Sequence, residues 1–88
     1  MAKILQDISF GDNLKKIRKA HGLTQEEVCA RLSAAGRPML RSTYGQIEIG
    51  IRNIFVSDLI ALKTIFNVSY DEFFEGLAPV NKYDQGYE

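Results

Sequence analysis

Between residues 41 and 49 the sequence carries side chains that suit hydrogen bonding to the edge of a nucleic-acid base. Placed on a helix at 100° per residue, one face of this segment consists of short or uncharged residues, namely Ser42, Gly45, Gln46 and Ile49. A glutamine can form two hydrogen bonds to adenine, a serine can donate or accept one, and an isoleucine can contact the thymine methyl group. Such a face predicts close approach to DNA, although a helix facing water or a partner protein would also accommodate these residues.

The other face of the same segment predicts contact with a hydrophobic core. Apolar side chains recur there at the spacing i, i+4, i+7 and i+11, namely Leu40, Tyr44, Ile47 and Ile51. We therefore expect a helix over about 41–49 that ends at Gly50, with this stripe turned inward. Arg41 stands at its N-terminus, where free N–H groups favour a phosphate.

Two starts are compatible with the sequence of this helix. Leu40 has no side chain that can cap a helix, and a missing N-cap costs about 1 kcal/mol. The alternative is a later start, at a capping box formed by Thr43 and Gln46. Arg41 and Ser42 would then lie outside the helix.

Two helices are predicted before this segment. The first has a cap at Ser9 and Asp12, ends at Gly22, and carries an apolar stripe made of Phe10, Leu14, Ile17 and His21. The second opens with a capping box at Thr24 and Glu27 and runs to about Ala35. Its inward residues are Val28 and Leu32, and Gly36 and Pro38 end it.

Two further helices are predicted after it. One spans about Val56–Phe66, with Leu59, Leu62 and Phe66 inward and Asn67 as a left-handed end. The other begins at a capping box of Ser69 and Glu72, carries Phe73 and Phe74, and ends at Gly76. No strand is predicted, so the fold class is all-α, a compact bundle of five helices. We expect an N-terminal arm over 1–7, one domain over 8–76 and a C-terminal tail over 77–88.

The charges are distributed unevenly although the net charge is zero. Residues 1–52 carry +4 and residues 53–88 carry −4. A polyanion would be attracted to the first part and repelled by the second, although clustering by chance explains the charges equally well. The basic surface is expected around the third helix, at Lys15, Lys19, Arg37, Arg41 and Arg52.

The remaining composition argues against an enzyme and against secretion. No arrangement of residues suggests a nucleophile with its base, a metal site or a phosphate-binding loop, so no catalytic residue, metal or cofactor is predicted. Cys29 is the single cysteine and is expected to pack in the core. Without a disulfide, a signal peptide or an apolar run of about 20 residues, the chain is expected in the cytoplasm and not in a membrane.

Three stretches of the sequence resemble the lambda-repressor-like, or XRE, family of helix-turn-helix domains. LKKIRKAHGLTQEEVCARL (residues 14–32) resembles the first two helices, RSTYGQIEIGIR (41–52) the recognition helix, and LIALKTIFNVSYDEFF (59–74) the last two helices. The stretch between the second and third helices (residues 33–40) is about five residues longer than the usual turn, as in a subgroup of short bacterial members. The resemblance implies a transcriptional regulator of the repressor type, with the helix at about 41–49 in the major groove of double-stranded DNA.

The resemblance also implies roles for individual residues. Gln25 would bond a phosphate and stiffen the recognition helix. The residues that would reach base edges are Arg41, Ser42 and Gln46, and those that would touch the DNA backbone are Thr43, Arg52 and Asn53. Arg18 and Glu48 would form a structural ion pair between the first and third helices.

A recognition helix reads only a few base pairs, so we expect a homodimer on an inverted repeat. Apolar residues of the acidic C-terminal half would form its interface, namely Phe74, Leu77 and Val80. The alternative function is a protein-interaction module, such as an antitoxin or adaptor, that uses the same fold to hold another protein.

Overall fold

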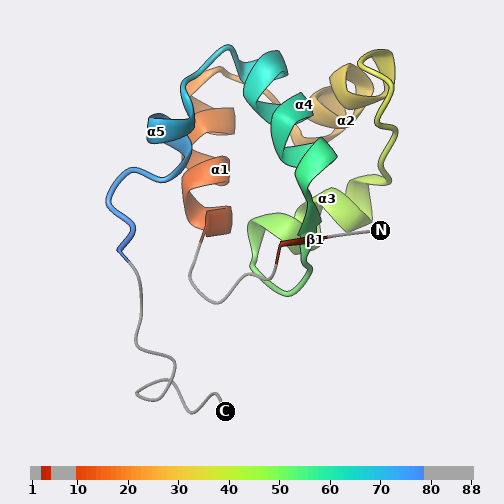
Figure 1. The fold of residues 1–88 in the computed structure, drawn as a ribbon. Coiled ribbons are helices and arrows are strands. Elements are labelled where there is room, and N and C mark those ends of the chain that lie inside the picture. The colour runs from red at the N-terminus through yellow and green to blue at the C-terminus, as the bar shows by residue number, and fades with distance from the viewer. Residues whose placement is uncertain (1–2, 5–9, 79–88) are drawn as a thin grey trace.

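Five helices surround one hydrophobic core in the computed structural model, which describes residues 3–4 and 10–78 (Figure 1). The elements follow in the order β1 (Lys3–Ile4), α1 (Phe10–Ala20), α2 (Gln25–Ala34), α3 (Arg41–Glu48), β2 (Ile54–Phe55), α4 (Val56–Phe66) and α5 (Tyr70–Phe73). The predicted all-α class is confirmed, with helix boundaries close to the expected ones. The predicted cap at Ser9 and the end of the tail (79–88) lie outside the described residues.

Local sequence signals fix the ends of several helices. The capping box of α2 forms in full: Thr24 Oγ1 accepts from the Glu27 amide at 3.1 Å, and the Thr24 amide donates to Glu27 Oε1 at 2.9 Å. The hydrogen bond from the Thr24 amide is the main cause of a lowered pKa of the Glu27 carboxyl. The box of Ser69 and Glu72 forms in the same way at α5. Asn67 adopts the predicted left-handed conformation, with φ of 54°, and ends α4.

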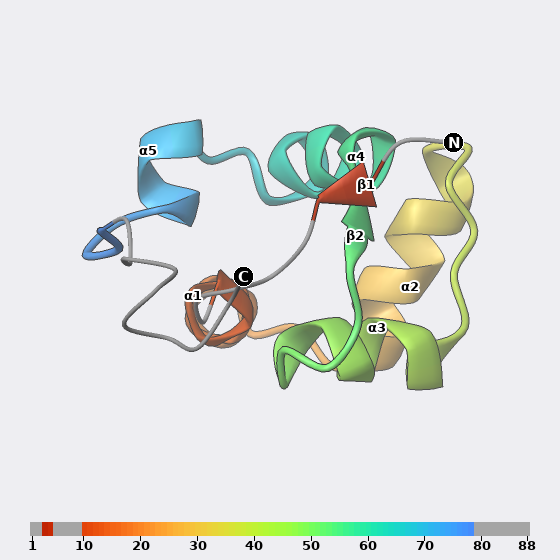
Figure 2. The same ribbon diagram turned by 60° about the horizontal axis from the view of Figure 1, so that its bottom comes forward.

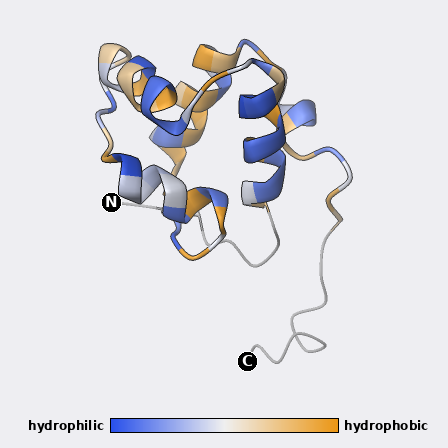
Figure 3. Cartoon of the chain, turned by 180° about the vertical axis from the view of Figure 1, so that it is seen from behind, coloured by the Kyte–Doolittle hydropathy of each residue, from blue (hydrophilic) through white to orange (hydrophobic). Residues whose placement is uncertain are grey.

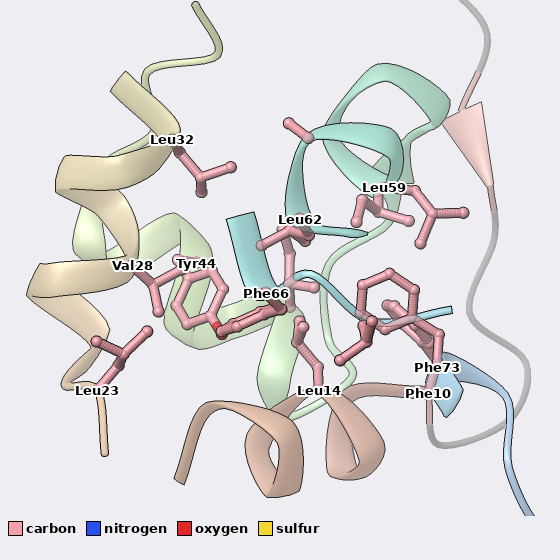
Figure 4. Packing of buried hydrophobic residues seen from close by; sticks show 14 residues of the cluster. Phe10, Leu14, Leu23, Val28, Leu32, Tyr44, Leu59, Leu62, Phe66 and Phe73 are labelled. Atoms are coloured by element: carbon pink, nitrogen blue, oxygen red, sulfur yellow. The ribbon is translucent and has the colours of Figure 1, made fainter. Parts of the chain in front are cut away.

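The core is formed by all five helices, by Ile54 of β2, and by Leu23 and Val68 in the connections between helices (Figure 4). Its largest fully buried side chains are Tyr44, Phe66, Phe73, Leu14, Leu32, Ile47, Ile54, Leu62 and Val28. Phe10 packs edge-on against Phe73, with ring centroids 5.8 Å apart. The Asn13 amide donates to the backbone carbonyls of Phe73 and Glu75, both at 2.9 Å, and so attaches α1 to the end of α5.

A short antiparallel ladder joins β1 to β2, where the sequence predicts no strand. Lys3 pairs with Phe55 and Ile4 with Ile54. Strands of two residues are too short for an alternating pattern to be visible in the sequence. The ladder attaches part of the predicted N-terminal arm to the segment between α3 and α4.

Two of the four residues predicted to face inward from the third helix are exposed. Tyr44 and Ile47 are buried, but Leu40 is 74% exposed and Ile51 is 69% exposed. The helical spacing holds only within α3, and both residues lie outside it. Leu40 precedes the helix in an extended conformation, and Ile51 follows Gly50, whose φ is 84°. His21 is also exposed, because α1 ends at Ala20, although its ring contacts that of Phe66 at 5.7 Å.

Helix α3 lies at the edge of the molecule. Figure 2 shows α1 and α3 on one side and α4 and α5 on the other, with the ladder between α3 and α4. The buried sides of α3 contact α1 and α2. The long connection before α3 (residues 35–40) leads from the end of α2 past α4, where Arg37 Nε donates to Asp58 Oδ1 at 2.9 Å. This arrangement leaves the remaining side of α3 uncovered by other helices.

Candidate nucleic-acid interface

The third helix begins early enough to include both residues whose position was in doubt. Leu40 is its N-cap and makes no side-chain capping bond, so Arg41 and Ser42 lie in the first turn. The alternative capping box of Thr43 and Gln46 does not form, because α3 begins at Arg41 and Thr43 lies inside the helix. The first N–H groups of α3 therefore lack a side-chain cap.

The two faces of α3 differ sharply in burial. Tyr44, Ile47 and Glu48 are buried, whereas Arg41 and Ser42 are exposed and Gln46 is half-buried. In Figure 3 the middle of α3 is pale, whereas its start is blue and its last turn is blue and orange. The single acidic residue of α3 is Glu48, which is buried. No carboxylate of this helix therefore opposes a phosphate backbone.

Arg18 and Glu48 form a buried ion pair between α1 and α3. Arg18 Nε donates to Glu48 Oε2 at 2.7 Å, and Arg18 Nη2 donates to Glu48 Oε1 at 3.1 Å. Arg18 Nη1 donates to the Leu23 carbonyl at 2.9 Å, in the turn before α2. One guanidinium thus holds α1, the α1–α2 turn and the base of α3 in a fixed arrangement, as the family resemblance implied.

The charges of this pair stabilise each other. The hydrogen bond to Glu48 raises the pKa of the Arg18 guanidinium above its ordinary value, and burial only partly opposes this shift. Burial raises the pKa of the Glu48 carboxyl, but the hydrogen bonds that the carboxylate accepts, above all from Arg18, lower it by more. The net shift of its pKa is therefore downward. Burial also raises the pKa of the neighbouring Tyr44, whose hydroxyl has no hydrogen-bond partner of standard geometry among the described residues.

The lowered pKa of Glu48 predicts how the stability of the Glu48→Gln variant depends on pH. Glutamine keeps the shape of the side chain but removes the charge that pairs with Arg18. A group with a depressed folded-state pKa stabilises the fold above its unfolded pKa, here about 4.5, and this contribution is lost as pH falls through the folded pKa. The wild type should therefore be more stable than Glu48→Gln near neutral pH, and the difference should shrink below about 4.5.

Urea unfolding of both proteins over this pH range measures that difference. Because all other carboxyl groups are shared, their titration largely cancels in the comparison. A difference that stays constant or grows under acidic conditions would contradict the assigned role of Glu48.

Gln25 connects the buried ion pair to the exposed face of α3. Its Nε2 donates to Glu48 Oε1 at 3.1 Å, and its Oε1 accepts from Arg41 Nη1 at 3.0 Å. A carboxylate only accepts and a guanidinium only donates, so both ends of the amide are fixed by chemistry. A continuous chain of hydrogen bonds therefore runs from Arg18 in the core to Arg41 on the surface.

The other site residues predicted from sequence gather at the two ends of α3. Thr43 is half-buried in the first turn, and Asn53 is half-buried just before β2. Arg52 follows the end of the helix and donates from Nε to Gln46 Oε1 at 2.7 Å. The structure thus places Gln25, Arg41, Ser42 and Thr43 around the start of α3 and Gln46, Arg52 and Asn53 around its end.

Arg37 has a different role from the one predicted. The sequence places it in the basic surface around the third helix, but its guanidinium pairs with the buried Asp58 of α4. The pair attaches the long α2–α3 connection to α4. The two residues are 21 positions apart, and no local pattern in the sequence links them.

Gly11 is a structural residue that the sequence reasoning missed. It lies in the first turn of α1, and a Cβ built there would lie 2.5 Å from the Ile47 carbonyl oxygen and closer still to that of Glu48. The first turn of α1 therefore contacts the last turn of α3 backbone to backbone. The only signal in the sequence is a glycine at a helical position, which by itself does not reveal what lies opposite.

Among the described residues no group of three or more histidine, cysteine, aspartate or glutamate side chains could hold a metal ion. Cys29 is half-buried and packs against the core, and burial raises the pKa of its thiol. Over the same part of the chain, no helix has the length and apolar character needed to cross a membrane.

Comparisons with known proteins agree with this geometry. A family model described as helix-turn-helix matches residues 14–73. The solved crystal structure of the restriction-modification controller protein C.AhdI from Aeromonas hydrophila is similar, with a TM-score of 0.66 and 30% sequence identity. The similarity covers 76% of this chain and 94% of that protein. No curated protein matches the sequence.

Proposed function

This chain belongs to the XRE-type helix-turn-helix family and is a DNA-binding regulator of transcription, and we propose that it is a repressor that places α3 in the major groove of double-stranded DNA. Its similarity to a controller protein supports a regulatory role over the whole domain. Bound at a promoter, a protein of this kind would exclude the polymerase by occupying the same DNA.

The observation that carries the proposal is the contrast between the two sides of α3. Its inner side is held by a buried ion pair and by Gln25, so the helix is presented in a fixed orientation. Its outer side carries Ser42 and the partly exposed Gln46, and it ends at Ile49, which is 70% exposed. A rigid helix with short, uncharged outer side chains suits insertion into the major groove.

Individual roles follow from these positions. Arg41, Ser42 and Gln46 would contact base edges, since all three lie on α3 away from the core. Thr43, Arg52 and Asn53 would contact the sugar–phosphate backbone at the two ends of the helix. Gln25 has its amide oxygen on Arg41, so its second Nε2 hydrogen is the group that would reach a phosphate.

A homodimer on an inverted repeat would give this small domain enough contacts for specificity. Two recognition helices related by a two-fold axis would read half-sites about 34 Å apart. Phe74 is 44% exposed and Leu77 is half-buried, so both can contribute to an interface on the α5 side, away from α3. Val80, the third residue of the predicted interface, lies outside the described residues.

The experiment that tests the function selects bound sequences from random double-stranded DNA and then measures affinity for the selected site at increasing salt. A protein that contacts about six to ten phosphates loses roughly 10³- to 10⁵-fold in affinity when salt rises from about 50 to about 200 mM. We expect a loss of affinity in this range as salt rises, and an inverted repeat in the selected sites. Sedimentation should show a complex of two protein chains on the DNA. A promoter that overlaps the site should be transcribed less when the protein is bound.

Exposed apolar side chains on α4 support the alternative function, a protein-interaction module. Ile60 is 49% exposed and Val56 is 45% exposed, on a helix that would face away from DNA. An apolar protein interface would not weaken with salt, and no sequence would be enriched from random DNA. A one-to-one complex on a non-palindromic site would refute the dimer while leaving DNA recognition in place.

A further inference from the structure

The contact between Arg52 and Gln46 fixes which end of the glutamine amide is presented to a ligand. Arg52 Nε donates to Gln46 Oε1 at 2.7 Å. A guanidinium has donors only, so the glutamine must turn its oxygen, and not its nitrogen, toward the arginine. The Nε2 group is then the end that remains for a base, and no described residue accepts a hydrogen bond from it.

The turn after α3 builds this contact. The Ile51 amide donates to the Gln46 carbonyl at 3.0 Å, and the Gly50 amide donates to the Ile47 carbonyl at 3.1 Å. Gly50 has a φ of 84°, a left-handed conformation that reverses the chain directly after the helix. This turn places Arg52 beside Gln46. Both residues line one surface hollow together with Asn53.

We propose that Arg52 determines the base preference of Gln46, and that the glutamine reads a base whose major-groove edge offers acceptors without a neighbouring amino group, guanine or thymine. This inference rests on the proposed DNA-binding function and names the specificity of the same site. The two-bond pairing of a glutamine with adenine needs Oε1 as an acceptor for the adenine N6 amino group. That oxygen is bonded to Arg52. The amide nitrogen instead donates to guanine O6 or N7, or to thymine O4.

The proposal changes what Arg52 contributes. A guanidinium has five N–H donors, so the Nε bond to Gln46 is compatible with a phosphate contact through the Nη groups. Arg52 is then a positioning residue for base reading as well as a backbone contact. Its loss would alter the sequence that is preferred, and not only the strength of binding.

The test uses the full chain and four DNA duplexes that differ at a single position. That position is the one at which Gln46→Ala loses its preference in a selection from random DNA. We expect the wild type to favour guanine or thymine there. Arg52→Ala should raise the affinity for adenine relative to the wild type's preferred base by about tenfold, within the range that one paired base contact discriminates.

Two further variants separate this effect from the loss of a charge. Arg52→Lys keeps a donor for Gln46 Oε1 and should retain the wild-type base preference. Arg31→Ala removes an exposed arginine of α2 that does not contact Gln46, and should leave the preference unchanged. Each variant is compared across the four duplexes, so a uniform loss of phosphate contacts cancels.

Three results would overturn the inference while the DNA-binding function stands: a wild type that favours adenine at this position, an Arg52→Ala variant with an unchanged ratio, or a Gln46→Ala variant that relaxes no position. If the wild type enriches no sequence, the proposed function itself fails. The two failures are therefore distinguishable in the same experiment.

Discussion

Gly11→Ala is expected to lower the free energy of unfolding by about 3 kcal/mol, the upper part of the range for inserting a methyl group into a tightly packed site. The added Cβ would overlap the carbonyl oxygens of Ile47 and Glu48, which belong to the last turn of α3. Backbone atoms cannot rotate away as a side chain can, so α1 and α3 must separate. Urea unfolding of the variant measures this loss.

Gly45→Ala is the matched control, because it makes the same change at a helical glycine of α3. A Cβ at Gly45 would lie 3.4 Å from Gln25 Oε1, an ordinary contact with a side chain that can adjust. Alanine favours a helix by roughly 0.5–1 kcal/mol over glycine, so this variant should be unchanged or more stable. Equal stability of the two variants would show that the close approach at Gly11 does not limit the packing.

The helices could be predicted from the sequence because their signals are local. Thr24 with Glu27, and Ser69 with Glu72, lie three residues apart and satisfy each other's backbone groups within one turn. Asn67 likewise ends α4 through its own backbone conformation. Patterns of this kind are complete within a few residues, and they require no knowledge of the rest of the fold.

Features that depend on distant residues could not be predicted in this way. The Arg37–Asp58 pair and the approach of Gly11 to α3 bring together segments that no spacing rule connects. The inward placement of Leu40 and Ile51 was wrong because the helical period was extended beyond the eight residues of α3. Periodicity gives the face of a residue only where the helix is known to continue.

The candidate site was predicted partly from residue types and partly from the family resemblance. The residue types of the outer face of α3 indicated contact with a base edge, but the pairing of Arg18 with Glu48 came from the family resemblance alone. The hydrogen bonds that orient Gln25 and Gln46 were not predicted at all. They depend on the positions of Arg41 and Arg52, which are set by the start of the helix and by the turn after it.

Arg18→Ala is expected to lower the free energy of unfolding by about 3–5 kcal/mol, the cost of leaving a buried charge without its partner. Glu48 is 2% exposed, so water cannot replace the two hydrogen bonds from the guanidinium. The substitution also removes the bond to the Leu23 carbonyl in the turn before α2. Denaturant unfolding near neutral pH gives the size of the loss.

A double variant, Arg18→Met with Glu48→Leu, tests whether the loss comes from the unpaired carboxylate. Replacing both charges with apolar side chains removes the buried charge as well as its partner, and such exchanges are often close to neutral. The double variant should therefore be more stable than Arg18→Ala. Arg31→Ala, at an exposed arginine, should change stability by no more than about 0.5 kcal/mol. If Arg18→Ala matched that small change, the ion pair would contribute no more than a pair on the surface, and Glu48 would not anchor α3.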